Sequence, residues 1–395
     1  MPAPVHADDL RKVYVEPTNA CNLSCTTCVR HAWDEPEGFM EWVTFEAVVD
    51  GLADAAGKDG FTGDGEGGAA AGPHAAGTIA FMGLGEPLLH PRFLDMVRLA
   101  KARGLRAEVT TNALLLDDEM AAGLLRAGLD QLVVSIDGAS AEAFGRVRSG
   151  ASLDKVVENV RRLHDGRGPN YGPGMSIGIE FVAMRSNVGE LPGLNRLAAE
   201  MGATFIIVSN VLAYTPELQD ETLYDHRVTA SEGGETTAAP RWQLPTFDWD
   251  EEVGAALGRA LARSGPVDFA AGGGAGGASG VTGHCPFVEA RACAVAWHGG
   301  VSPCPPLLHT YTCFVRGREK RMMRWEVGRL PDEALAAIWA QPAYAAFRER
   351  VRRFDFPPCT DCGCELAEGN EEDCFGNPHP VCGDCLWARG VVRCA

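Results

Sequence analysis

The sequence contains no stretch of about 18 consecutive apolar residues, the length that a membrane-spanning helix needs, although 46% of its 395 residues are hydrophobic. Residues 1–9 lack the basic stretch and the apolar core of a secretory signal peptide. The net charge of −18 argues against nucleic-acid binding, because phosphate contacts require basic patches. These absences predict a cytoplasmic protein with no membrane or nucleic-acid partner.

Cysteine, in contrast, is abundant: the chain has 14, of which three lie near the N-terminus and eleven follow His284. In a reducing compartment this number predicts metal ligands rather than disulfides. The residues between the late cysteines are rich in proline, glycine and tryptophan. We therefore expect the C-terminal region to have little core of its own and to depend on metal ligation for its fold.

The first three cysteines form a C-x3-C-x2-C array, Cys21, Cys25 and Cys28, just after a short apolar segment. Three thiolates this close can hold three irons of a cubane cluster, which leaves the fourth iron open to a substrate or cofactor. The alternative is a zinc site that His31 completes as the fourth ligand.

Residues 12 to about 210 alternate short apolar segments with amphipathic ones, which predicts parallel βαβ units. The predicted strands are Val13–Glu16, Thr78–Met82, Ala107–Thr110, Leu132–Ile136, Ser176–Val182 and Thr204–Val208. The predicted helices begin near Thr44, Arg92, Asp117, Ala141 (continuing through Leu153–His164) and Leu191. Six such units predict an α/β fold, an open partial (β/α)6 TIM-like barrel whose ligand site lies at the C-terminal ends of the strands.

Changes in composition predict three parts. Residues 1–225 form the barrel core, with a Gly/Ala-rich insertion at 54–77. Residues 226–283 form a linker that includes a Gly-rich segment at 271–283. Residues 284–395 form a Cys-rich C-terminal domain stabilised by iron–sulfur clusters.

Two features resemble the radical S-adenosylmethionine (SAM) enzymes. The cysteine array resembles their cluster signature, and Gly83–Pro87 resembles their G-G-E-P motif, with Leu84 replacing a glycine. The resemblance implies a SAM-binding 4Fe–4S cluster on the three cysteines and reductive cleavage of SAM to a 5′-deoxyadenosyl radical. One departure is Thr27, where many members have an aromatic residue before the third cysteine.

The same resemblance assigns residues to SAM binding. Gly85 and Glu86 would hold its amino group, and Ser135 with Arg148 its carboxylate and ribose. An arginine suits a carboxylate because it donates two parallel hydrogen bonds. Arg146 competes with Arg148 for this role, and the sequence does not choose between them. No catalytic side chain beyond the cluster is predicted.

Cys285, Gly299 and Cys304 match the opening of the SPASM pattern, an extension of radical SAM enzymes that holds auxiliary iron–sulfur clusters. The spacing of the later cysteines departs from this pattern. After the C-x2-C pair Cys359 and Cys362, the next cysteine is either Cys364, after one residue, or Cys374, after eleven. The resemblance implies one or two auxiliary 4Fe–4S clusters. Their predicted ligands are Cys285, Cys304, Cys359, Cys362, Cys374, Cys382, Cys385 and Cys394. The alternative is a zinc ribbon built from Cys359, Cys362, Cys382 and Cys385.

Three segments resemble one subgroup, the radical SAM maturases of tungsten-cofactor oxidoreductases: Cys28–Pro36, Ser302–His309, and Asn370–Asn377 with Cys382–Trp387. This implies a protein, peptide or cofactor substrate, with a tungsten-dependent aldehyde oxidoreductase as partner. It also implies a low-potential electron donor of the ferredoxin or flavodoxin type. Two alternatives remain: modification of a small ribosomally made peptide, and a zinc-stabilised binding module without activity.

Overall fold

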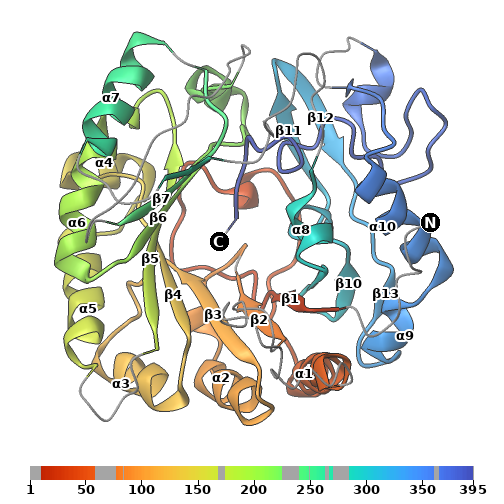
Figure 1. The fold of residues 1–395 in the computed structure, drawn as a ribbon, viewed down its shortest axis with the longest axis horizontal. Coiled ribbons are helices and arrows are strands. Elements are labelled where there is room, and N and C mark those ends of the chain that lie inside the picture. Colours follow the sequence, from red (N-terminus) through yellow and green to blue (C-terminus); the bar gives the residue numbers. More distant parts are fainter. Residues whose placement is uncertain are drawn as a thin grey trace, which may run out of the picture.

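The computed structural model describes residues 10–57, 77–82, 84–167, 174–224, 240–248, 250–262, 267–269, 284–359 and 364–394. Within these residues one eleven-stranded sheet has the order β13-β10-β9-β1-β2-β3-β4-β5-β6-β7-β8. Figure 1 shows this sheet curving around the middle of the molecule, with helices α1–α7 on its outer face. None of the helices in these ranges is both long and apolar enough to cross a membrane.

The six predicted core strands are confirmed. They are β1 (Lys12–Val15), β2 (Thr78–Phe81), β3 (Arg106–Thr111), β4 (Gln131–Ser135), β5 (Ser176–Ala183) and β6 (Phe205–Asn210). All five neighbouring pairs in this series are parallel. Most of their side chains are buried, as expected for a parallel sheet that is covered on both faces. The C-terminal ends of these strands therefore share one edge of the sheet.

The helices of the core are α1 (Trp42–Gly57), α2 (Phe93–Ala102), α3 (Asp118–Ala127), α4 (Ala141–Val147), α5 (Leu153–Asp165) and α6 (Leu194–Met201). The single helix predicted from Ala141 is in fact two. Arg148 leaves the helical conformation at the end of α4, and Gly150 has a φ of +85°. Ser152 then caps α5 by accepting a hydrogen bond from Lys155 N. The break lets Arg148 turn toward the interior.

Strands from both flanking regions extend the sheet. On one side, β7 (Arg241–Leu244) pairs in parallel with β6, and β8 (Val267–Phe269) with β7, with α7 (Glu251–Leu261) between them. These elements lie within the segment predicted as a linker. Asp250 caps α7 by accepting from Val253 N. Residues 58–76, most of the predicted Gly/Ala-rich insertion, and the Gly-rich segment 271–283 lie outside the described residues.

On the other side, β9 (Ala292–Val295) pairs in parallel with β1, followed by antiparallel β10 (Gly300–Ser302) and β13 (Gly328–Arg329). The other C-terminal elements are α8 (Pro286–Glu289), β11 (Tyr311–Val315), β12 (Arg318–Met322), α9 (Leu335–Trp339) and α10 (Pro342–Arg353). Trp339 and Tyr344 are buried in the same core cluster as the barrel strands. The C-terminal region therefore shares the core of the barrel, which differs from the expectation that it has little hydrophobic core.

Two glycines in helices provide a matched test of how α1 packs against the C-terminal region. A Cβ on Gly51 would lie 2.7 Å from Leu335 Cβ in α9, whereas one on Gly145 in α4 would meet nothing within 4 Å. We expect Gly51→Ala to lower the free energy of unfolding by about 1–3 kcal/mol through overpacking. Gly145→Ala should raise it by up to about 1 kcal/mol through helix propensity. Urea denaturation measures both, and equal effects would contradict the described packing.

Candidate active site

The three N-terminal cysteines lie in the loop after β1, at the edge where the parallel strands end. All three are partly exposed, and Cys21 and Cys28 line a cavity of about 550 Å³. Burial raises the pKa of each thiol, that of Cys25 to about 11. The charges of Cys28 and Cys21 add to the rise in the pKa of Cys25, and the charge of Arg148 opposes it. The donor set suits an iron–sulfur cluster, which binds thiolates.

Hydrogen bonds hold the cysteine loop in place. Thr18 Oγ1 donates to Gly38 O at 2.6 Å, and Asn19 exchanges hydrogen bonds with Pro36 O and Gly38 N, each at 2.9 Å. The amide of Leu23 donates to Cys21 Sγ at 3.4 Å, which favours a thiolate there. The loop therefore has a defined shape before any ligand binds.

His31 is the fourth ligand of the zinc alternative, and one of its ring nitrogens contacts the backbone of the cysteine loop. Its Nε2 lies 2.9 Å from the carbonyl oxygen of Cys25. In the part of the chain that the structure describes, no three His, Cys, Asp or Glu side chains are grouped so that they could hold one metal ion. A cubane requires a wider arrangement, because each thiolate binds an iron of its own.

Gly85 and Glu86 brace the cysteine loop. A Cβ on Gly85 would lie 2.3 Å from Ala20 O, so only glycine fits against the loop. Glu86 is 2% exposed and uses both oxygens internally. Its Oε1 accepts from Thr111 Oγ1 at 2.6 Å, and its Oε2 accepts from Asn112 N at 2.8 Å. Glu86 therefore joins the ends of β2 and β3.

Asn112 extends this hydrogen-bond network from Glu86 to the cysteine loop, a role that sequence reasoning missed. Its Nδ2 donates to Asn22 Oδ1 at 2.8 Å and lies 4.0 Å from Cys21 Sγ. The motif Thr110–Asn112 at the tip of β3 was the available signal, since small polar residues at strand tips face the ligand edge.

Arg148 faces the cysteine loop, whereas Arg146 does not. Arg148 Nη2 lies 2.8 Å from Asp137 Oδ2, and its Nη1 lies 4.0 Å from Cys25 Sγ. Burial opposes the charge of Arg148, but Asp137 and Cys25 outweigh burial and raise its pKa. Arg146 pairs with Glu142 on the surface and is 56% exposed. Of the two candidates, only Arg148 is placed to meet a ligand at the cluster.

Ser135 is the last residue of β4 and is partly exposed at the same edge. Glu180 of β5 lies beside it in register. Glu180 also lines a second cavity of about 260 Å³, which we call the central cavity. Cys28 and Cys394 are both among the residues that line it. The central cavity thus connects the cysteine loop with the C-terminal cysteines.

Four C-terminal cysteines form what we call the inner group: Cys285, Cys304, Cys382 and Cys385. Burial raises the pKa of the Cys304 thiol well above its ordinary value, and the charges of the other three raise it further. Burial likewise raises the pKa of the Cys285 and Cys382 thiols, and the charge of Cys385 raises both further. Cys304, Cys382 and Cys385 also line one pocket, and Cys285, Cys304 and Cys394 pack against one buried apolar cluster. Thiol donors of this kind suit an iron–sulfur cluster.

Two further predicted ligands are Cys359 and Cys374. Cys359 Sγ lies beside the turn between Cys382 and Cys385, because a Cβ on Gly383 would be 3.1 Å from it. Burial raises the pKa of the Cys359 thiol to about 11, and Cys374 is among the groups that raise it further. Cys374 is exposed and Cys364 is partly exposed. Cys362 lies outside the described residues. We call Cys359 and Cys374 the outer pair.

A buried ion pair supports the inner group. Lys320 Nζ lies 2.7 Å from both carboxylate oxygens of Asp384, and these side chains are 3% and 4% exposed. Asp384 lies between Cys382 and Cys385 in the sequence. Burial raises the pKa of the Cys385 thiol; the charge of Asp384 adds to this rise, and the charge of Lys320 opposes it. Sequence reasoning missed the pair, for which Asp384 inside a C-x2-C motif was the one signal.

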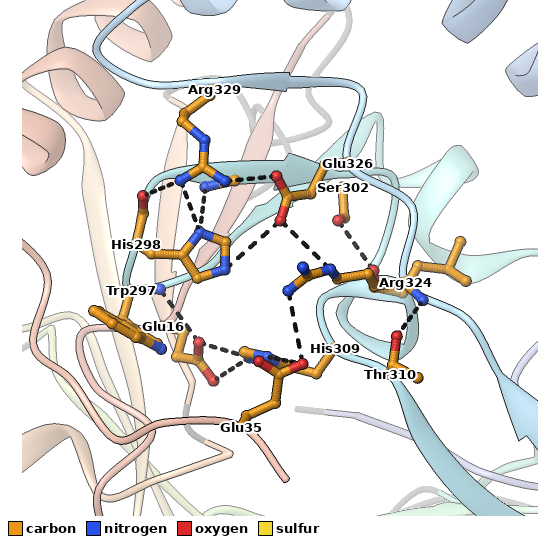
Figure 2. A network of polar contacts seen from close by, with 12 residues as sticks. Glu16, Glu35, Trp297, His298, Ser302, His309, Thr310, Arg324, Glu326 and Arg329 are labelled. Atoms are coloured by element: carbon orange, nitrogen blue, oxygen red, sulfur yellow. Dashed lines mark hydrogen bonds and ion pairs between the residues drawn. The ribbon is translucent and has the colours of Figure 1, made fainter. Parts of the chain in front are cut away.

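A network of polar side chains also joins the cysteine loop to the C-terminal region (Figure 2). His309 Nε2 lies 2.9 Å from Glu16 Oε2, and both side chains are 1% exposed. Its Nδ1 lies 3.8 Å from Glu35 Oε1, which in turn lies 3.7 Å from Arg324 Nη1. Glu16 precedes the cysteine loop and His309 follows Cys304. The network therefore fixes these two segments relative to each other.

Two protein-family models match this chain, one in its N-terminal part and one in its C-terminal part. Residues 15–181 match the model of the radical SAM superfamily. Residues 285–363 match the SPASM model, described as an iron–sulfur cluster-binding domain.

Similar proteins and structures span nearly the whole chain. The tungsten-containing aldehyde ferredoxin oxidoreductase cofactor-modifying protein of Pyrococcus furiosus is 30% identical over 98% of this chain and 97% of its own length. The AdoMet-dependent heme synthase of Oleidesulfovibrio alaskensis is 23% identical over 97% of this chain and 84% of its own. Streptococcus suis SuiB bound to its precursor peptide SuiA covers 95% of this chain and 75% of its own, with a TM-score of 0.57 at 14% identity. The fold is similar also to anSMEcpe with bound AdoMet and a peptide, at a TM-score of 0.52 and 16% identity, over 91% of this chain and 88% of that one.

The two arginines allow a direct test of SAM binding. We expect Arg148→Met to weaken SAM binding by about tenfold or more, equivalent to about 1.4 kcal/mol, because a guanidinium close to the cluster loop is lost. Arg146→Met removes only a surface ion pair and should leave binding unchanged. Equilibrium binding to the reconstituted protein measures both affinities.

A control separates binding from folding, because Arg148→Met leaves Asp137 buried without its cation. The double variant with Asp137→Asn removes that unpaired charge and should recover thermal stability. SAM affinity should stay low in the double variant. Recovery of affinity together with stability would show that Arg148 acts only on the fold.

Proposed function

This chain belongs to the radical SAM superfamily and carries a SPASM domain, and we propose that it matures a tungsten-dependent oxidoreductase by modifying its cofactor or its peptide. Radical SAM enzymes reductively cleave SAM to a 5′-deoxyadenosyl radical, and this chain is such an enzyme. The single observation that carries the tungsten proposal is the 30% identity to the Pyrococcus furiosus cofactor-modifying protein over 98% of this chain and 97% of that protein.

The cysteine loop is the proposed cluster site, with Cys21, Cys25 and Cys28 as ligands. A 4Fe–4S cluster bound there would supply an open iron for SAM and the electron that cleaves it. In the proposal, Arg148 donates hydrogen bonds to the SAM carboxylate, and Ser135 lies on the ribose side. Gly85 keeps the strand tip close to the loop, and Glu86 positions Asn112 rather than meeting SAM itself, because its two oxygens are already used.

The inner group is the proposed site of one auxiliary cluster. The outer pair, with Cys362 as the sequence predicts, is proposed to bind a second. The substrate would enter the central cavity, which is lined by Cys28 of the cysteine loop and by Pro305, the residue after Cys304. Electrons would come from a low-potential donor of the ferredoxin or flavodoxin type. Apolar and aromatic walls such as Tyr214 and Tyr311 would exclude water from a radical formed there.

Loss of one cluster ligand provides the first test. Cys25→Ala leaves two thiolates in the loop, so formation of 5′-deoxyadenosine from SAM should fall to background, with a loss of about four irons per chain. The matched control is Cys293→Ala, because this thiol is fully buried in β9 and belongs to neither cysteine group. Chromatography of the products and iron analysis measure both effects. Undiminished cleavage by Cys25→Ala would reject the proposed cluster site.

The partner is tested in cells that contain a tungsten-dependent aldehyde oxidoreductase. Deletion of this gene should leave that enzyme synthesised but inactive. A Cys25→Ala copy should fail to restore its activity, because radical chemistry, and not binding alone, is required. A Cys293→Ala copy should restore it. A fully active oxidoreductase in the deletion strain would reject the tungsten proposal and favour a separate peptide substrate.

A further inference from the structure

The C-terminal tail, residues 390–394, runs into the middle of the curved sheet (Figure 1). Two hydrogen bonds from its backbone hold it against the end of β6. Asn210 Nδ2 donates to Val391 O at 2.8 Å, and Arg393 N donates to Ser209 Oγ at 3.0 Å. Because these contacts use backbone groups of the tail, its position does not depend on the Arg393 side chain.

The guanidinium of Arg393 has no anionic partner. Arg393 lines the central cavity and is partly buried. Its Nε is fully buried and has no hydrogen-bond acceptor, whereas Nη1 and Nη2, which also lack an acceptor among the described residues, retain accessible surface. Within the described part of the chain no carboxylate pairs with this side chain. Arg393 therefore brings an uncompensated positive charge to the cavity.

Arg148 shows how the structure treats a buried guanidinium that belongs to the fold. Burial opposes its charge, but the Asp137 carboxylate at 2.8 Å outweighs burial, and Glu180, the one carboxylate among the described residues that line the central cavity, also helps to raise the pKa of Arg148. At Arg393 burial acts alone and lowers the pKa to about 10. A partly buried charge without a counter-ion is costly. A ligand that carries an anion would remove this cost.

The other walls of the central cavity indicate what the anion is attached to. Tyr214, Tyr311 and Trp387 line the cavity, and the rings of Tyr214 and Tyr311 meet edge to face with their centroids 5.6 Å apart. Aromatic walls of this kind pack against flat apolar groups. The volume of about 260 Å³ is at the lower end of the range for small-molecule pockets, about 300–1,000 Å³. The cavity therefore suits a small molecule better than a peptide segment.

We propose that Arg393 binds the anionic group of a small organic substrate, a phosphate or carboxylate on a flat apolar body, in the central cavity. A guanidinium recognises either group by donating two parallel hydrogen bonds. Cys28 of the cysteine loop lines the same cavity, so a ligand held there lies beside the proposed cluster site. The inference rests on the proposed function for the reaction itself, and it selects a cofactor molecule over a peptide as the substrate.

Binding of simple probes tests this role without turnover. Phenyl phosphate, benzoate and the neutral analogue benzyl alcohol are titrated into the reconstituted holoenzyme with saturating SAM present, and calorimetry measures each Kd. We expect wild type to bind at least one of the two anions at least tenfold more tightly than the alcohol. Arg393→Met should abolish this preference, Arg393→Lys should retain part of it, and the surface control Arg146→Met should equal wild type. Equal affinity of wild type for the anions and the alcohol would overturn the proposal.

A fourth probe separates the possible sources of the anion. Between phenyl phosphate and benzoate, the tighter ligand identifies the group as phosphate or carboxylate, and either result supports the proposal. The amide of N-acetylglutamate carries the same carboxylate on a peptide unit. If it binds wild type as tightly as the better aromatic anion, the cavity takes a peptide side chain and the assignment to a small molecule is wrong.

Two further measurements distinguish a ligand-binding role of Arg393 from a structural one and from SAM binding. Because Arg393 has no anionic partner, the Tm of ligand-free Arg393→Met should equal or exceed that of wild type. A lower Tm would make Arg393 a structural residue. The affinity for SAM should be unchanged, and a tenfold loss would make Arg393 a SAM-binding residue instead; either result would overturn the proposal. Absence of any SAM cleavage by wild type would reject the proposed function, whereas the probe affinities would still decide the role of Arg393.

Discussion

Strand β1 is the element on which the arrangement of the site depends. It bonds in parallel to β2 on one side and to β9 on the other, so the N-terminal barrel and the C-terminal region form one sheet. The cysteine loop leaves the C-terminal end of this shared strand. It therefore lies between the strand tips that are proposed to bind SAM and the inner group of cysteines. Because β1 has partners on both sides, it is not an exposed sheet edge.

Buried charges fix the same edge of the sheet. Asp137 with Arg148 and Lys320 with Asp384 each join segments that are separated in the sequence. Such pairs add little net stability, because removing charges from water offsets much of their attraction. Breaking one leaves an unpaired buried charge, which is costly. Each pair therefore acts mainly by holding one segment in position. Arg148 with Asp137 holds a strand tip next to the cysteine loop, and Lys320 with Asp384 holds the C-x2-C turn.

Sequence reasoning identified the six core strands because their apolar segments are short, regularly spaced and separated by amphipathic ones. It did not identify β7 and β8, which lie in a stretch that reads as a linker, or the pairing of β9 with β1. Pairing between segments as distant in the sequence as Lys12 and Ala292 leaves no local pattern. The division of one predicted helix into α4 and α5 depends on Arg148, whose conformation serves a contact with Asp137.

The sequence by itself predicted the cluster chemistry, because the spacing of Cys21, Cys25 and Cys28 occurs together with the Gly83–Pro87 motif. The spacing alone left a zinc site open. The sequence likewise predicted the parallel strands of the core and the close approach of the backbone at Gly85. The tertiary structure decided which arginine faces the cluster, because Arg146 and Arg148 differ only in the helix end that turns one of them inward. It also decided that both carboxylate oxygens of Glu86 accept hydrogen bonds from the tip of β3. These outcomes depend on contacts between separate segments of the chain, which no local pattern records.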